Sequence, residues 1–187
     1  MKRILTILAL LFLTTGMIFA QTNVFFSEYI EGSSDNKALE IYNGGSTTVD
    51  LTEFNILTNY NGNPWSGKYI FPAGATLAAG EVWVIANSSA DSSILAVADD
   101  VMAYNDSGYI VGFNGDDVRA LVKIAGTDTT IIDIIGAYDG VDPGSGWAVA
   151  GTPDATKDHT LVRKTSVTTG QTDWAVSAGT TADDSEW

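Results

Sequence analysis

The chain has 187 residues, enough for one domain that buries a full core without a disulfide or a metal. It has no cysteine, which excludes disulfide frameworks, thiolate zinc sites, thiol catalysis and lipoprotein anchoring. The formal charge is −14, so nucleic acid and anionic lipid are poor partners, and hydrophobic residues at 45% argue against general disorder.

The first twenty residues have the pattern of a secretory signal peptide. Lys2 and Arg3 precede the apolar run 4–13, and a small residue, Ala20, stands before Gln21. The alternative is an uncleaved anchor, but the run is short for a span of roughly 20 residues. We therefore expect cleavage of residues 1–20, no membrane span afterwards, and a secreted protein, extracellular or periplasmic. Cleavage leaves seven basic and 23 acidic residues, a formal charge of −16.

Strand patterns follow one another along the mature chain. Aromatic, β-branched or alternating runs occur at 24–29, 38–42, 54–60, 68–71, 81–86, 118–124, 130–135 and 159–164. In the second run Leu39 and Ile41 should face one way, and Glu40 and Tyr42 the other. Run 81–86 is apolar on both faces and reads as a central strand. We expect Val82, Val84, Val122 and Ile134 to be buried.

Turn signals at intervals of roughly 8–15 residues favour an all-β fold, an antiparallel sandwich or barrel. Asn114-Gly115 is a strong two-residue hairpin signal. Residues 91–98 predict one short helix, with Asp91 as its N-cap and Ile94, Leu95 and Val97 covering one end of the sandwich. The domain should span residues 21–176. Residues 177–187 read as a polar tail or linker, although Trp187 can instead pack back on the sandwich.

Several segments in order resemble the bacterial lamin-tail domain family. They are SEYIEGSSDNKALEIYN (27–43), LAAGEVWVIANSSADSSILAVAD (77–99), FNGDDVRALVK (113–123), IIDIIGAYDGVDPGSGW (131–147) and DHTLVRK (158–164). The resemblance implies an immunoglobulin-like antiparallel β-sandwich. It also implies an accessory or binding role without a catalytic residue set, since such domains occur alone or attached to exported nucleases and phosphatases. Fold resemblance does not supply a ligand.

Catalytic constellations are weak in this sequence. His159 is the only histidine, and the resemblance places it in an ordinary strand. Gly144-Ser145-Gly146 lacks the strand and helix that a nucleophile elbow requires. We read the chain as no enzyme by itself. The rival hypothesis is an N-terminal fragment of a secreted nuclease or phosphatase.

Calcium is the metal that acidic loops favour, and no other cofactor is expected. The candidate ligands are Asp116, Asp117, Asp139 and Asp142, although none has the regular spacing of an EF-hand loop. For Asp116 and Asp117 the alternative is a pair of acids that flank the turn at Asn114-Gly115.

Aromatic side chains provide the candidate ligand contacts: Tyr60, Trp65, Tyr69 and Trp147 lie in or beside Gly-rich loops. The alternative is that they pack in the core. The leading interpretation is a non-catalytic binding or tethering module, accessory to an exported enzyme or cell-surface protein, whose partner is a protein or cell-surface polymer. A calcium-dependent glycan-binding module is the third hypothesis.

The signal peptide can be tested on the exported protein. We expect the mature chain to begin at or near Gln21, because the small residue Ala20 precedes it. Intact-mass spectrometry of the secreted product measures this. A product that keeps Met1 and stays in the cytoplasm would contradict export.

Overall fold

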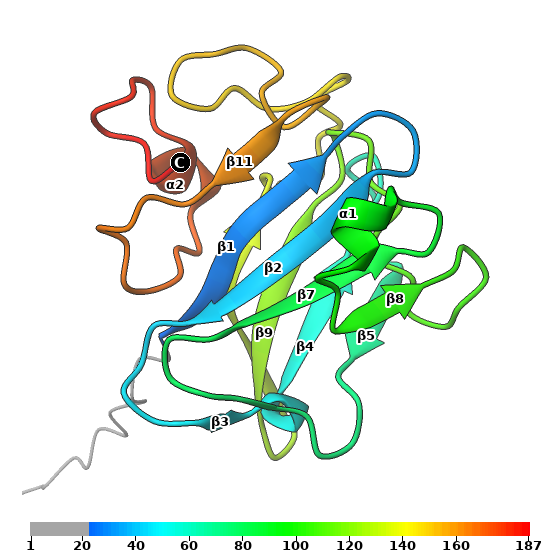
Figure 1. Cartoon of the computed structure of the whole chain (residues 1–187). Coiled ribbons are helices and arrows are strands. Elements are labelled where there is room, and N and C mark those ends of the chain that lie inside the picture. The colour runs from blue at the N-terminus through cyan, green and yellow to red at the C-terminus, as the bar shows by residue number, and fades with distance from the viewer. Residues whose placement is uncertain (1–22) are drawn as a thin grey trace, which may run out of the picture.

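The structure is a computed structural model that describes residues 23–187, so the expected signal peptide and its cleavage site lie outside the described residues. Two β-sheets pack face to face, with long loops at one end and a C-terminal segment against one side (Figure 1). This is the immunoglobulin-like β-sandwich that the sequence predicted. Within residues 23–187, no helix is long and apolar enough to cross a membrane.

The larger sheet has five strands and contains both the first and the last strand of the chain. In spatial order it holds β11 (Thr160–Val162), β1 (Val24–Glu31), β2 (Lys37–Asn43), β7 (Val82–Asn87) and β8 (Asp100–Met102). Its pairs are antiparallel except β7 with β8, which run parallel because the short helix α1 (Ser92–Leu95) connects them.

The second sheet has four antiparallel strands. In spatial order they are β10 (Asp128–Ile135), β9 (Arg119–Ala125), β4 (Phe54–Thr58) and β5 (Gly67–Ile70). The short strands β3 (Val49–Asp50) and β6 (Thr76–Leu77) pair beside the 3₁₀ turn η1 (Leu51–Glu53), and α2 (Trp174–Ala178) follows β11.

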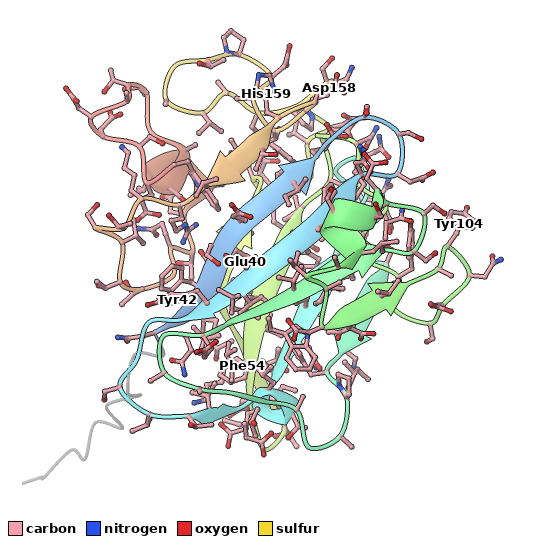
Figure 2. The ribbon with its side chains drawn as sticks, in the orientation of Figure 1. Glu40, Tyr42, Phe54, Tyr104, Asp158 and His159 are labelled. Carbon is pink, nitrogen blue, oxygen red and sulfur yellow. The ribbon has the colours of Figure 1, made fainter. Side chains whose placement is uncertain are left out.

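The core forms where alternating apolar side chains of the two sheets meet. Leu39 and Ile41 are fully buried, whereas Glu40 and Tyr42 lie half-buried on the outer face of the five-stranded sheet, as the alternation predicted (Figure 2). Val84, Val122 and Ile134 are buried as expected.

The expectation for Val82 is wrong, since its side chain is 39% exposed. Val82 and Val84 share the outer face of β7, but only Val84 lies in the small cluster that packs against α1. The helix therefore covers part of a sheet face and not one end of the sandwich. It is shorter than predicted, and Val97 beyond it is 64% exposed. Asp91 precedes α1 without a side-chain capping bond and binds Asn36 instead.

The hairpin expected at Asn114-Gly115 is also wrong. No strand comes directly before these residues, which belong to the loop between β8 and β9, and Asp116 and Asp117 are buried. The hairpin of β9 lies at the other end of this strand, where Gly126, whose φ is +64°, helps to join it to β10. A local turn signal was outweighed by the burial of the two acids.

A buried ion pair joins the two sheets. Asp133 on β10 contacts Nη1 of Arg163, just after β11, at 3.1 Å, and both side chains are almost completely buried. The Asp133 carboxylate also accepts the backbone N–H of Phe26 at 2.7 Å and of Gln171 at 2.9 Å. The pair therefore holds β10, β1 and the segment after β11 in one arrangement.

The last residues pack against this ion pair. The guanidinium of Arg163 lies 4.3 Å from the ring centroid of Trp187, and both side chains contact the Ser177 hydroxyl. The boundary expected at residue 176 falls inside α2. Residues 177–187 pack against the sandwich and do not form an extended linker. The alternative in which Trp187 packs back on the domain is the one observed.

Removal of one partner should destabilise the sandwich strongly. We expect Asp133→Ala to lower the free energy of unfolding by about 3–5 kcal/mol, because Arg163 is left charged and buried. Glu53→Ala is the matched control. Its salt bridge to Lys123 at 3.7 Å is exposed and should contribute at most about 1 kcal/mol. Urea denaturation measures both, and equal losses would contradict the role of the buried pair.

Candidate functional site

Four loops meet at the end of the sandwich that lies at the upper right in Figure 1. They are the β1–β2 turn, the β4–β5 loop, the β8–β9 loop and the long loop 136–159. Hydrogen bonds connect them. Asp158 N–H donates to Glu31, the Thr156 hydroxyl donates to Gly115 O at 2.6 Å, and Asn59 N–H donates to Val118 O at 3.1 Å. This end is therefore built from segments far apart in the sequence.

Asp116 and Asp117 form a buried acid pair at this end. The Asn61 backbone N–H donates to Asp117 at 3.2 Å, and the Asn61 amide donates to Asp116 at 3.3 Å. In the orientation that satisfies its hydrogen bonds, the Asn114 amide donates to both acids. The acids connect the β4–β5 loop to the β8–β9 loop, so their first role is structural.

The pKa of Asp117 is raised to about 6, mainly by burial; the nearby Arg119 guanidinium opposes the shift, and the charge of Asp116 adds to it. Burial also raises the pKa of Asp116, with a contribution from the charge of Asp142. Asp117 therefore titrates near pH 6, above the range in which an exposed aspartate titrates.

The four acids proposed as calcium ligands are not arranged as one metal site among residues 23–187. Asp139 and Asp142 are exposed in the loop after β10, where each accepts a backbone N–H two residues on. Among residues 23–187, no three acidic, histidine or cysteine side chains are arranged to hold a metal ion. The acidic β1–β2 turn is also engaged, since Glu31 forms an ion pair with Lys37.

Arg119 supports the loop end from inside the sandwich. Its side chain is fully buried, and its guanidinium lies 5.1 Å from the ring centroids of both Tyr60 and Phe113. Nε donates to Ile110 O at 2.6 Å, and Nη1 donates to Asn59 O at 3.3 Å. One core residue thus fixes the backbones of two loops.

The four aromatic residues expected to contact a ligand do not form one surface. Tyr69 is buried in the core, and its hydroxyl donates to Asp100 at 2.6 Å. Trp147 lies against Gly136, where a Cβ atom would come within 2.6 Å of its ring. Trp65 stacks on Tyr138 with centroids 4.0 Å apart. Tyr69 borders a hollow beside Asp100, and Tyr60 lines a separate cavity together with two other tyrosines.

That cavity has a volume of about 450 Å³ and is lined by Tyr60, Tyr104, Tyr109 and Gly112. We call it the tyrosine cavity. Tyr104 is 81% exposed, and its ring meets that of Tyr109 edge-on with centroids 5.7 Å apart. The sequence analysis missed Tyr104 and Tyr109. The signal that could have found them is the pair of tyrosines that flank the turn-forming run Asn105-Asp106-Ser107-Gly108.

His159 offers no catalytic arrangement in this structure. It is exposed just before β11, far from Tyr104 in Figure 2. Its Nδ1 lies 2.6 Å from the Lys157 carbonyl, and no serine hydroxyl or carboxylate bonds the ring in the described part of the chain. The geometry of a serine hydrolase triad requires such partners.

The raised pKa of Asp117 predicts a pH dependence of stability. The pKa of Asp117 is higher in the folded protein than its unfolded value near 3.9, so its protonated form stabilises the fold. This contribution to the free energy of unfolding is complete below about pH 3.9 and is lost as pH rises through about 6. The loss is at most about 3 kcal/mol. We expect the stability of Asp117→Asn to fall less than that of the parent between pH 4 and 6.5. Urea denaturation across this range measures the difference, and parallel curves would contradict it.

A family model described as Lamin Tail Domain matches residues 19–139. This range includes strands of both sheets and all the residues that line the tyrosine cavity. The match ends before β11, so two of the segments that carried the resemblance extend past it or lie outside it. A search of curated proteins found no match. The chain belongs to the lamin tail domain family.

Proposed function

We propose that this protein is an exported, non-catalytic binding module whose loop end holds a polymer on the outside of the cell. The observation that carries the proposal is the tyrosine cavity, in which a highly exposed aromatic ring adjoins two rings that are fixed in place. A single exposed tyrosine is ordinary, whereas an open cavity walled by three is typical of a ligand site.

Two further features support binding over catalysis. In the part of the chain that the structure describes, the one histidine bonds no serine hydroxyl or carboxylate, and the buried acids accept hydrogen bonds from Asn61. The hydrophobic run before Gln21 supports export. In this role the module brings an exported enzyme or a cell-surface protein to the polymer. The module and that protein can belong to one chain or to two.

Cosedimentation with washed envelope fragments of the producing cells tests the proposal. We expect the parent protein to bind and Tyr104→Ala to bind about tenfold less, because a stacking surface is lost. Tyr138→Ala is the matched control, since Tyr138 is also an exposed tyrosine, 43% accessible, in another loop. It should bind like the parent.

Equal sedimentation of the two variants would contradict the site, and absence of binding by the parent would contradict the function. The supernatant gives a second readout. Release of soluble sugar, phosphate or peptide in proportion to protein and time would show turnover and overturn the non-catalytic assignment.

A further inference from the structure

We propose that the tyrosine cavity binds a sugar residue of an uncharged polysaccharide, with a face of the sugar ring against Tyr104 and Tyr109. This inference rests on the proposed binding function and names the chemical class of the polymer. It depends on the shape of the cavity, on the fixed position of two of its walls and on the sign of the surrounding charge.

The shape suits a pyranose ring. The rings of Tyr104 and Tyr109 meet at 70°, and Tyr60 forms a further wall. A pyranose has apolar C–H faces bounded by hydroxyl groups, so it can lie flat on one aromatic ring while its edge meets another. The volume of about 450 Å³ lies within the range of small-molecule sites and leaves the neighbouring sugars of a chain in solvent.

Two of the walls are held in position before any ligand arrives. The Tyr60 hydroxyl donates to Tyr109 O at 3.2 Å. The Tyr109 hydroxyl accepts from the Asn87 amide at 2.8 Å and lies 3.3 Å from Val111 O, to which it donates. A ligand therefore orders few side chains on binding, which reduces the entropic cost of association.

Gly112 is required for this arrangement. A Cβ atom at this position would come within 2.3 Å of Cε1 of Tyr109, so only glycine allows the ring to lie where it does. Tyr104 is the exposed wall by contrast: its side chain is 81% exposed, and its hydroxyl makes no hydrogen bond among the side chains that the structure describes.

The charge around the cavity selects against anionic polymers. Burial raises the pKa of the Tyr109 hydroxyl, and the charge of Asp35 adds to the shift while the buried Arg119 opposes it. The acids Asp116 and Asp117 accept hydrogen bonds from Asn61, the neighbour of Tyr60. Arg119 is fully buried behind the Tyr60 ring, and no lysine or arginine lines the cavity. A sulfate or uronate group here would meet negative potential with no cation to pair with.

Purified polysaccharides test the inference directly. Laminarin, dextran, xylan and mannan serve as neutral probes, and each is compared with its sulfated derivative by affinity electrophoresis or calorimetry. We expect binding to at least one neutral polymer and weaker binding to its sulfated form. Tyr104→Ala should lose about tenfold in affinity, while Tyr104→Phe, which keeps the ring, and Tyr138→Ala should keep the parent affinity.

The outcomes separate this inference from the proposed function. If envelope binding depends on Tyr104 but every purified polysaccharide fails, or if protease treatment of the envelope abolishes binding, the ligand is not carbohydrate and the inference falls while the binding module stands. Tighter binding of the sulfated polymers, or loss of binding in Tyr138→Ala with Tyr104→Ala unaffected, would also overturn it. Because Tyr104 is exposed, a folding defect should not obscure these results.

Discussion

Asp133 carries a negative charge into the contact between β10 and β1, where burial of an unpaired charge costs several kcal/mol. The charge is compatible with folding because Arg163 and two backbone N–H groups converge on the carboxylate. Both strands have a β-bulge at this contact, between Phe26 and Glu28 in β1 and between Ile131 and Asp133 in β10. The β1 bulge therefore accompanies the turn of the Phe26 N–H toward the Asp133 carboxylate. The carboxylate in turn fixes the two sheets relative to one another.

The partners of Asp133 come largely from the part of the chain after the family match. Arg163 and the Gln171 N–H lie beyond residue 139, and Trp187 covers the guanidinium from outside. Gly170 allows this close approach, because a Cβ atom there would come within 2.3 Å of Ile132 O. The matched region thus depends on later residues to satisfy its buried charge. Residues 140–187 are part of the same folding unit, which is why a boundary placed at residue 176 by composition has no counterpart in the structure.

Sequence reasoning predicted the parts of this fold that depend on local alternation. The strands around Leu39, Val84 and Ile134 and the sandwich class follow from apolar periodicity and turn spacing. It did not predict features that depend on distant partners. Asn114-Gly115 has the composition of a hairpin, but the acids that follow are satisfied by Asn61, more than fifty residues away. Of the expected ligand aromatics, Tyr69 belongs to the core because it lies on β5 opposite Ile56 of β4, whereas Tyr60 follows the end of β4 and lines the tyrosine cavity.

Arg119 connects the stability of the sandwich to the shape of the candidate site. It belongs to β9, yet its guanidinium bonds to the carbonyls of Ile110 and Asn59, and these precede the loop segments that contain Tyr60 and Gly112. The Tyr60 ring lies against the same cation, so it cannot tilt into the cavity without losing that contact. The Tyr60 wall of the cavity is therefore held from the core side, while Tyr104 lies exposed on the solvent side. A site with this asymmetry can hold one ring of a repeating polymer rigidly and still accept different neighbouring units, which suits attachment to a polymer better than it suits chemistry on one bond.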